Sequence, residues 1–334
     1  MVTRPLRVGI LGAARIAPMA LVRPARAVPE VEIVAVAARE RPRAEAFARK
    51  HGIPRTCASY DEVIRDADLD AVYNPLPNSL HCEWTIRALE AGKHVLCEKP
   101  LASNADEAAR MAETAEKTGL VLMEAFHWRY HPLAARMQEI VASGELGRIE
   151  HVEASMCIPL ILPGDIRYRL DLAGGALMDA GCYAVSGVRF LAGAEPEVVR
   201  AEARLSSPGV DRWMRAELRF PDGRTGRVTA SLFSTALLRM QARVRGDRGE
   251  LYVLNPFAPQ FFHRLKVRTP AGSRVERVRS EPTYTHQLRA FVRAVRGEAP
   301  IATDGRHGVA NMRVIDAIYR AAGLAPRGSW REAT

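Results

Sequence analysis

Lysine is scarce in this chain of 334 residues. Only five of its 48 basic residues are Lys, and the other 43 are Arg. The formal net charge of +10 raises nucleic acid as a possible partner. However, the Arg residues are spread along the whole chain, and their densest run, 264–279, alternates with apolar residues as the solvated face of a β-sheet does. We therefore expect no nucleic-acid partner.

Cysteine motifs and long apolar runs are also missing. The five cysteines are odd in number, form no CxxC, and have no His at metal-ligand spacing. We expect them to be reduced core residues, and we expect no metal site. No signal peptide precedes the first apolar run, and no run is long enough to span a membrane. These absences are typical of a cytoplasmic protein without a membrane partner.

Five near-continuous apolar runs alternate with helical patterns over the first 125 residues. The runs are 6–12, 31–38, 69–76, 93–98 and 120–125. This alternation predicts a parallel, doubly wound sheet with helices on both faces. In such a sheet the ligand binds at the carboxyl ends of the strands, so the residues that follow each run are the candidates for a site.

The pattern changes after about residue 150. Short segments now alternate apolar and polar residues, and "PDG" (221–223) and "GDRGE" (246–250) are typical of hairpin turns. We expect a mainly antiparallel sheet with one solvated face and with helices against the other. Two helical patterns, 284–297 and 305–322, close the chain.

The first apolar run ends in "GILGAARIA", a glycine-poor version of the dinucleotide fingerprint GxGxxG. The aligned residues are Gly12, Ala14 and Ala17, so only the first glycine is present. Small residues still allow a pyrophosphate to approach the following helix, although an ordinary tight turn would explain the segment too. The cofactor candidates in this loop are Gly12, Ala13, Ala14, Arg15 and Ile16.

The second run ends in "AARERPR". An enzyme that uses NAD would place an acidic residue here to hold the ribose diol, whereas this chain has Ala38 and Arg39, with Arg43 close behind. Cationic side chains suit a 2′-phosphate, so the segment favours NADP and leaves NAD possible. The alternative is that the cations reflect the Arg-rich composition, and Glu40 also lies nearby.

The third and fourth runs end in "YNPLPNSLH" and "CEKP". A polar side chain of the first loop could face a nicotinamide or a substrate hydroxyl, although His81 would also suit a solvent-facing helical turn. Lys99 in the second loop could be an ordinary solvated loop lysine. At the carboxyl end of a parallel strand, however, it would point into the cleft, where its charge could lower the pKa of a neighbouring acid and hold a substrate oxygen. The cofactor candidates in these loops are Asn74, Pro75, Leu76, Asn78, His81, Glu98, Lys99 and Pro100.

Further along, "GGALMDAGCY" opens a helix with two glycines. Asp179 and Tyr183 are four residues apart and so share a helix face. Tyr183 suits a proton donor to an alkoxide if a nearby cation lowers its pKa, and Asp179 could bind substrate or orient Lys99. The alternative is a capped helix with a buried Tyr. Just before it, "GDIRYRLDL" places Arg167 and Tyr168 where they could contact substrate hydroxyls or an anionic group.

These motifs, together with "MEAFHWRYHP" (123–132), resemble in kind and order the Gfo/Idh/MocA oxidoreductases. The nearest branch contains dimeric dihydrodiol dehydrogenase, xylose dehydrogenases and sugar ketoreductases. The resemblance covers essentially the whole chain. It implies a Rossmann domain over 1–125, and a substrate-binding and oligomerising α+β domain with an open-faced sheet over 126–334. Ala14 departs from the usual second glycine, and Tyr183 stands where inositol dehydrogenases usually have His.

The resemblance also implies roles for several of these residues. Lys99 and Tyr183 would be catalytic with Asp179 assisting, and Arg129 would lie near cofactor or substrate. The substrate candidates are Lys99, His127, Arg167, Tyr168, Asp179 and Tyr183. We thus expect an NADP-dependent enzyme that transfers hydride to or from a sugar, keto-sugar or cyclic diol, assembled as a homodimer or homotetramer. Two alternatives remain open, a non-catalytic dinucleotide-binding regulator and an NAD-dependent glycosidase.

Overall fold

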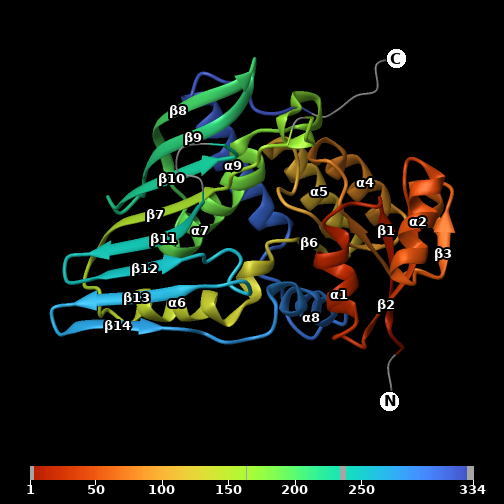
Figure 1. Ribbon diagram of the computed structural model, residues 1–334, viewed down its shortest axis with the longest axis horizontal. Helices are drawn as coiled ribbons and strands as arrows, with labels where there is room; N and C mark the ends of the chain where they lie inside the picture. The colour runs from red at the N-terminus through yellow and green to blue at the C-terminus, as the bar shows by residue number, and fades with distance from the viewer. Residues whose placement is uncertain (1–3, 163, 234–237, 329–334) are drawn as a thin grey trace. The chain divides into compact units, whose positions relative to one another are not determined.

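The computed structural model describes residues 4–162, 164–233 and 238–328 (Figure 1). The chain divides into two compact units, and each is built from separate stretches. The first unit holds Met1–Ala102, Asp106–Tyr130 and Pro282–Val309. The second holds Ser103–Ala105, His131–Glu281 and Ala310–Thr334.

A six-stranded parallel sheet forms the centre of the first unit. Its strands are β1 (Leu6–Leu11), β2 (Val31–Ala37), β3 (Arg55–Cys57), β4 (Ala71–Asn74), β5 (His94–Cys97) and β6 (Leu122–Glu124). They lie in the order β3-β2-β1-β4-β5-β6. Strands β2 and β3 are thus added on one side of β1, and β4, β5 and β6 on the other. The sequence predicts five of these strands. It misses β3, because three residues are too few to show a periodicity.

Helices connect these strands as the alternation predicts. They are η1 (Pro18–Val22), α1 (Arg23–Ala25), α2 (Arg41–His51), α3 (Tyr60–Arg65), α4 (Asn78–Glu90) and α5 (Ala105–Thr118), with η2 (His127–Tyr130) after β6 and α8 (Thr283–Val295). Strand β4 is buried throughout, as expected for a parallel sheet covered on both faces. The carboxyl ends of all six strands therefore meet at one edge of this sheet.

Helix α8 completes the core of the first unit, although it lies far along the chain. Its Leu288, Phe291 and Val292 are buried in the same hydrophobic cluster as Val8 and Tyr73 of the parallel sheet. Residues 282–309 thus pack with the first unit. The domain boundary expected from the sequence, between 125 and 126, instead assigns them to the second domain. Sequence periodicity locates this helix but carries no information on which sheet its apolar face covers.

An eight-stranded sheet forms the second unit. Its strands are β7 (Ile149–Cys157), β8 (Glu197–Ser207), β9 (Val210–Arg219), β10 (Thr225–Ser231), β11 (Arg239–Gly246), β12 (Glu250–Leu254), β13 (Arg264–Thr269) and β14 (Gly272–Glu276). Their order is β14-β13-β12-β11-β7-β10-β9-β8. Strands β7 and β10 pair in parallel, and every other neighbouring pair is antiparallel. The predicted fold class, a parallel doubly wound sheet followed by a mainly antiparallel one, is confirmed.

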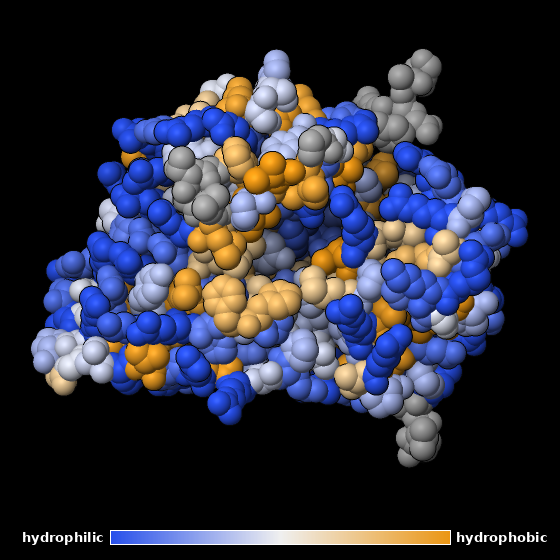
Figure 2. All heavy atoms as spheres, viewed as in Figure 1, coloured by the Kyte–Doolittle hydropathy of each residue, from blue (hydrophilic) through white to orange (hydrophobic). Residues whose placement is uncertain are grey.

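The helices of the second unit are α6 (Pro132–Ala142), η3 (Ile166–Tyr168), η4 (Leu170–Leu172), η5 (Leu177–Gly181), α7 (Cys182–Ala192) and α9 (Gly305–Ala321), whose first turn lies in the first unit. Helix α6 contacts β12 of the sheet, and η5 contacts β7, β9 and β10. Helix α7 contacts β7, β10 and β11. In Figure 2 hydrophilic side chains cover most of the visible surface over β11 to β14, as the alternating pattern predicts.

All five cysteines are buried, as their apolar sequence context suggests. Burial raises the pKa of the Cys82 thiol to about 12 and that of Cys97 well above its usual value, so these thiols stay protonated. Within residues 4–162, 164–233 and 238–328, no helix combines the length and apolar character needed to cross a membrane.

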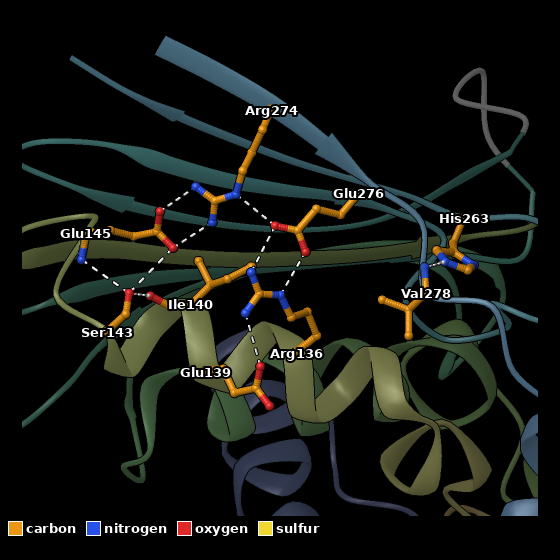
Figure 3. A network of polar contacts seen from close by, with 9 residues as sticks. All are labelled: Arg136, Glu139, Ile140, Ser143, Glu145, His263, Arg274, Glu276 and Val278. Carbon is orange, nitrogen blue, oxygen red and sulfur yellow. Dashed lines mark hydrogen bonds and ion pairs between the residues drawn. The ribbon is translucent and has the colours of Figure 1, made fainter. Parts of the chain in front are cut away.

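A chain of alternating charges fastens the edge strand β14 to helix α6 (Figure 3). Arg136 on α6 donates from Nε and Nη2 to the two carboxylate oxygens of Glu276, at 2.7 and 3.0 Å. Arg274 donates to Glu276 and also makes two bonds to Glu145, at 2.6 and 2.7 Å. An edge strand has one unpaired side, so these side-chain contacts secure a strand that backbone pairing holds from one side only.

Acid should release this edge strand. The hydrogen bonds from Arg136, more than any other contact, lower the pKa of Glu276 from 4.5 to about 2. A carboxylate whose pKa is lower in the folded than in the unfolded chain stabilises the fold above the unfolded value, and that stability is lost as pH falls from about 4.5 towards 2. We expect Glu276→Gln to lower the melting temperature at neutral pH and to make its fall below pH 5 shallower, measured by scanning calorimetry.

The exposed Glu90→Gln is the matched control, because it removes one carboxylate from the first unit. It should leave both the melting temperature and its pH dependence as in the native chain. If the Glu276→Gln protein lost stability below pH 5 as steeply as the native chain, the network would not be the acid-sensitive element.

Candidate active site

The loop after β1 has the geometry of a dinucleotide cradle. Gly12 adopts a φ of 104°, which favours glycine, and a Cβ there would lie 3.0 Å from the Leu76 side chain. The Ala14 N–H donates to the Gly12 carbonyl at 2.8 Å, which closes a tight turn. Ala13 and Ala17 are buried beneath it. The small side chains and the turned backbone thus fit a pyrophosphate, and the missing glycines are not needed for this fold.

Two cations follow the end of β2, as the sequence predicts. The Arg39 side chain is 88% exposed, and its guanidinium lies 3.9 Å from Glu40. Arg43 donates from Nη2 to the Ala13 carbonyl at 3.2 Å, which ties helix α2 to the glycine loop. The Tyr60 hydroxyl is hydrogen-bonded to the main chain of Arg39, and burial raises its pKa. Sequence reasoning did not include Tyr60, because no motif marks it.

The remaining cofactor candidates lie around this edge of the sheet. Ala13, Ala38, Pro75, Leu76 and Pro100 are buried, Ala14, Ile16 and Asn78 are half-buried, and Arg15 is exposed. Asn74 is fully buried, and its amide donates to the His81 carbonyl at 3.3 Å and to Thr85 at 3.1 Å. It therefore shapes the loop after β4 from inside the protein.

His81 joins the loop after β4 to the loop after β5. Its Nδ1 lies 2.9 Å from the Pro100 carbonyl and its Nε2 lies 2.8 Å from the Leu76 carbonyl. The ring is fully buried, which excludes the solvent-facing alternative, and burial lowers its pKa to about 4. A neutral ring donates from one nitrogen only, whereas a charged ring would donate to both carbonyls. Each ring nitrogen of His81 thus has a main-chain carbonyl of the protein as its partner.

Lys99 lies directly after β5, in a loop whose Lys99–Pro100 peptide bond is cis. It is half-buried, and the preceding Glu98 is buried. Tyr73 of β4 donates its hydroxyl proton to Glu98 Oε1 at 2.7 Å. Burial, reinforced by the Glu98 charge, raises the pKa of Tyr73 well above its ordinary value, so Tyr73 acts as a hydrogen-bond donor. The backbone just before Lys99 is thus anchored to the neighbouring strand.

A buried carboxylate holds the backbone just after Lys99. The Leu101 N–H donates to Glu124 Oε1 at 2.8 Å, and His307 Nδ1 lies 3.1 Å from Glu124 Oε2. Thr303 adds a hydrogen bond to the Glu124 main chain at 2.7 Å. Glu124 is fully buried at the end of β6. Lys99 is therefore presented on a loop that is fixed before it by the Tyr73–Glu98 bond, and after it by His81 at Pro100 and Glu124 at Leu101.

"HWRY" follows β6 and forms the turn η2. The His127 ring is buried and packs against Tyr284 of α8, with ring centroids 4.0 Å apart. The Arg129 guanidinium lies 5.6 Å from the ring of the buried Trp128. Both candidates thus belong to the first unit, and their surroundings include the distant helix α8.

In the second unit, Asp179 and Tyr183 lie on one helical segment, as predicted. The segment begins with a π-helical turn, η5, and continues as α7, so it is less regular than the sequence pattern indicates. Such turns often occur at functional sites. Tyr183 is 7% exposed, and its ring centroid lies 5.8 Å from that of Phe257.

Arg167 binds Asp179 directly. Its Nε lies 2.9 Å from Asp179 Oδ2, and its Nη1 lies 3.1 Å from the buried Asp165. The charge of Asp179, more than any other interaction, raises the pKa of Arg167. Tyr168 donates its hydroxyl proton to the Leu160 carbonyl at 2.8 Å. Two substrate candidates thus have structural partners, and Arg167 fixes the position of the Asp179 carboxylate.

Comparison with known proteins agrees with this architecture. The family model described as "Oxidoreductase family, NAD-binding Rossmann fold" matches residues 6–126, and the GFO/IDH/MocA C-terminal domain model matches residues 134–252. Among curated relatives, the D-xylose 1-dehydrogenase (NADP(+)) 2 of Haloferax volcanii is 41% identical over 94% of this chain and 96% of its own. A dTDP-3,4-didehydro-2,6-dideoxy-α-D-glucose 3-reductase of Actinomadura kijaniata is 34% identical over 89% of this chain and 90% of its own.

A solved structure shows the same fold over both units. It is KijD10, a 3-ketoreductase from Actinomadura kijaniata in complex with NADP and TDP-benzene. The TM-score is 0.89 with 31% identity, over 95% of this chain and 98% of that one. The resemblance indicated by the motifs is confirmed: the chain belongs to the Gfo/Idh/MocA family of oxidoreductases.

Proposed function

We propose that the protein is an NADP-dependent oxidoreductase that acts on a ring carbinol or ketone carbon of a sugar. The observation that carries this is the edge of the parallel sheet, where the Gly12 turn, the cations Arg39 and Arg43, and the doubly anchored Lys99 loop all follow strand ends. A phosphate cradle, cations for a 2′-phosphate and a fixed lysine ammonium suit hydride chemistry on an alcohol.

Bound NADP would accept or supply the hydride. Gly12 and its small neighbours would hold the pyrophosphate, and Arg39 and Arg43 would hold the 2′-phosphate. Tyr183 takes the proton from the substrate hydroxyl during oxidation and returns it during reduction. Lys99 stabilises the ionised forms of Tyr183 and of the substrate oxygen, and Asp179, fixed by Arg167, binds a neighbouring hydroxyl. A regulator that only binds dinucleotide would not need Lys99 or Tyr183.

A polyhydroxylated substrate is supported by the relatives, which are named for a pentose and for nucleotide-linked keto-sugars. D-xylose is therefore the first probe, because the relative named for it is 41% identical over nearly the whole chain. The proposal includes a homodimer or homotetramer formed through the sheet of the second unit. Helices α6 and α7 contact strands β7, β10, β11 and β12 of this eight-stranded sheet, and a second copy of the chain would pack on the face that such helices leave open.

The cofactor assignment predicts a selective loss. The Arg39→Ala/Arg43→Ala protein should bind NADP at least about tenfold more weakly than the native chain, because two cations near one phosphate are removed. Its affinity for NAD should fall much less than its affinity for NADP, since NAD has no 2′-phosphate and would lose only the support that Arg43 gives to the glycine loop. Quenching of protein fluorescence measures both affinities, and absorbance of the reduced nicotinamide with D-xylose measures turnover.

Arg41→Ala is the matched control, because Arg41 pairs with Glu45 on α2 at 3.0 Å and lies in the same arginine-rich segment. It should keep the NADP affinity. A native protein that preferred NAD would contradict the cofactor assignment, and steady product release with no net change in nicotinamide absorbance would favour the glycosidase alternative.

A further inference from the structure

The two glycines that open the Asp179–Tyr183 segment lie against a buried charged cluster. Gly175 adopts a φ of 136°, and a Cβ there would lie 2.2 Å from Asp211 Oδ1, 2.8 Å from Arg327 Nη2 and 2.9 Å from the Tyr319 hydroxyl. No larger residue fits this place without displacing the cluster. Three side chains from distant parts of the sequence thus leave room only for glycine at position 175.

Asp211 is the centre of this cluster. Its Oδ1 accepts a hydrogen bond from Arg327 at 2.6 Å and one from Tyr319 at 2.9 Å. Its Oδ2 accepts the main-chain N–H of Leu177 at 2.7 Å, at the first residue of η5. The exposed fractions of Asp211, Tyr319 and Arg327 are 0%, 0% and 3%. A buried carboxylate therefore caps the segment that carries Asp179 and Tyr183.

Arg327 binds the same turn from a second direction. Its Nε donates to the Gly174 carbonyl at 2.8 Å, and its guanidinium lies 4.0 Å from the Tyr319 ring centroid. Its own carbonyl accepts a hydrogen bond from Asn104 at 2.8 Å, which fixes the main chain after α9. The planar guanidinium makes these contacts at once, and a lysine ammonium could not reproduce them.

The glycine turn is also connected to the Asp179 side chain. The Gly175 N–H donates to the main-chain carbonyl of Arg167 at 2.8 Å, and the Asp179 N–H donates to the Gly175 carbonyl at 3.0 Å. Arg167 in turn binds the Asp179 carboxylate through its side chain. A displacement of the turn would therefore move Asp179 through its backbone and through Arg167.

We propose that Arg327 and Asp211 are positioning residues for the reaction, which place Asp179 and Tyr183 by clamping the Gly174–Gly175 turn from the end of the chain. This inference rests on the proposed function of Asp179 and Tyr183. Even a small displacement of catalytic groups from the reacting atoms strongly slows the reaction. Loss of the clamp should therefore lower turnover more than ligand affinity.

Two shortened chains test the proposal, one ending at Pro326 and one ending at Gly328. Only the first lacks Arg327, so the second is the matched control. We expect the peptide covering 174–183 to exchange its amide hydrogens at least about tenfold faster in the chain ending at Pro326, because Asp211, which accepts the Leu177 N–H, loses the Arg327 contact that holds it in place. Peptides from β11 and β12, and the affinity for NADP, should be unchanged.

Turnover with D-xylose and NADP supplies the second readout. The chain ending at Pro326 should show kcat reduced by about 10- to 100-fold with KM within about threefold, and the chain ending at Gly328 should match the native protein. Arg327→Lys in the full chain should recover part of the lost turnover, because it restores the charge beside Asp211 but not the bond to Gly174.

The exchange measurement separates this proposal from the proposed function. Unchanged exchange of 174–183 in a folded chain ending at Pro326 would overturn the clamp, whatever the activity. Faster exchange throughout the second unit would also overturn it, because Arg327 would then be a general stabilising residue. If that chain does not fold, Asp211→Asn in the full chain is measured in the same way. This variant keeps an oxygen for the Leu177 N–H but removes the charge that pairs with Arg327, so the same split is expected.

Discussion

A Lys99→Ala protein is expected to turn over D-xylose with NADP about a thousandfold more slowly than the native chain, within the range of groups that assist proton transfer. The loop itself should persist, because its anchors are the Pro100 carbonyl on His81 and the Leu101 N–H on Glu124. The affinity for NADP should therefore change only slightly. Stopped-flow kinetics and fluorescence titration measure the two quantities.

Lys117→Ala provides the comparison for this result. Lys117 is an exposed lysine of the same unit and pairs with Glu113 one helical turn away. Its removal changes the net charge equally, so it should leave kcat within about twofold, since exposed pairs contribute little. Full turnover by Lys99→Ala on a substrate that the native chain oxidises would refute the assigned role.

Tyr183→Phe should lower kcat by about 10²- to 10⁴-fold, because only the proton-carrying hydroxyl is removed. The ring keeps its packing against Phe257, whose centroid lies 5.8 Å away, so the melting temperature should stay close to the native value. The pH profile gives a second readout. In the native protein, one limb of the plot of kcat against pH should reflect the titration of Tyr183. That limb should be missing from the residual activity of the variant.

Tyr252→Phe is the matched change elsewhere in the second unit. The Tyr252 hydroxyl, on β12, donates to Gln241 at 3.3 Å, and nothing in the proposed mechanism involves it. This variant should retain native kcat and the native pH profile. Equal activities of the two phenylalanine variants would exclude Tyr183 as the proton carrier and would favour a group outside α7.

The sequence predicts those parts of the site that follow directly from strand ends. "GILGAARIA", "AARERPR" and "CEKP" each come after a buried apolar run, and parallel strands bring such ends to one edge. The same logic yields the fold class, because near-continuous apolar runs and alternating ones indicate different sheets. It could not find β3, whose three residues lack a period, nor the π-helical turn at Leu177–Gly181.

The supporting contacts could not be predicted because their partners are far apart in the sequence. Glu124 meets His307 across 183 residues, and Asp211 meets Arg327 across 116. No local spacing marks such pairs, and in an arginine-rich chain one more Arg attracts no notice. The sequence suggests a ligand or solvent as the partner of His81. In the structure, its ring nitrogens instead lie beside two main-chain carbonyls.

The placement of α8 bears on how the protein is made. During synthesis the ribosome releases the parallel-sheet strands first, yet Leu288, Phe291 and Val292, which fill their core, emerge only after residues 131–281. Domains that are continuous in sequence can fold one after another as they appear, and this one cannot. The apolar surface that α8 covers in the folded first unit is therefore left uncovered until nearly the entire chain has been synthesised.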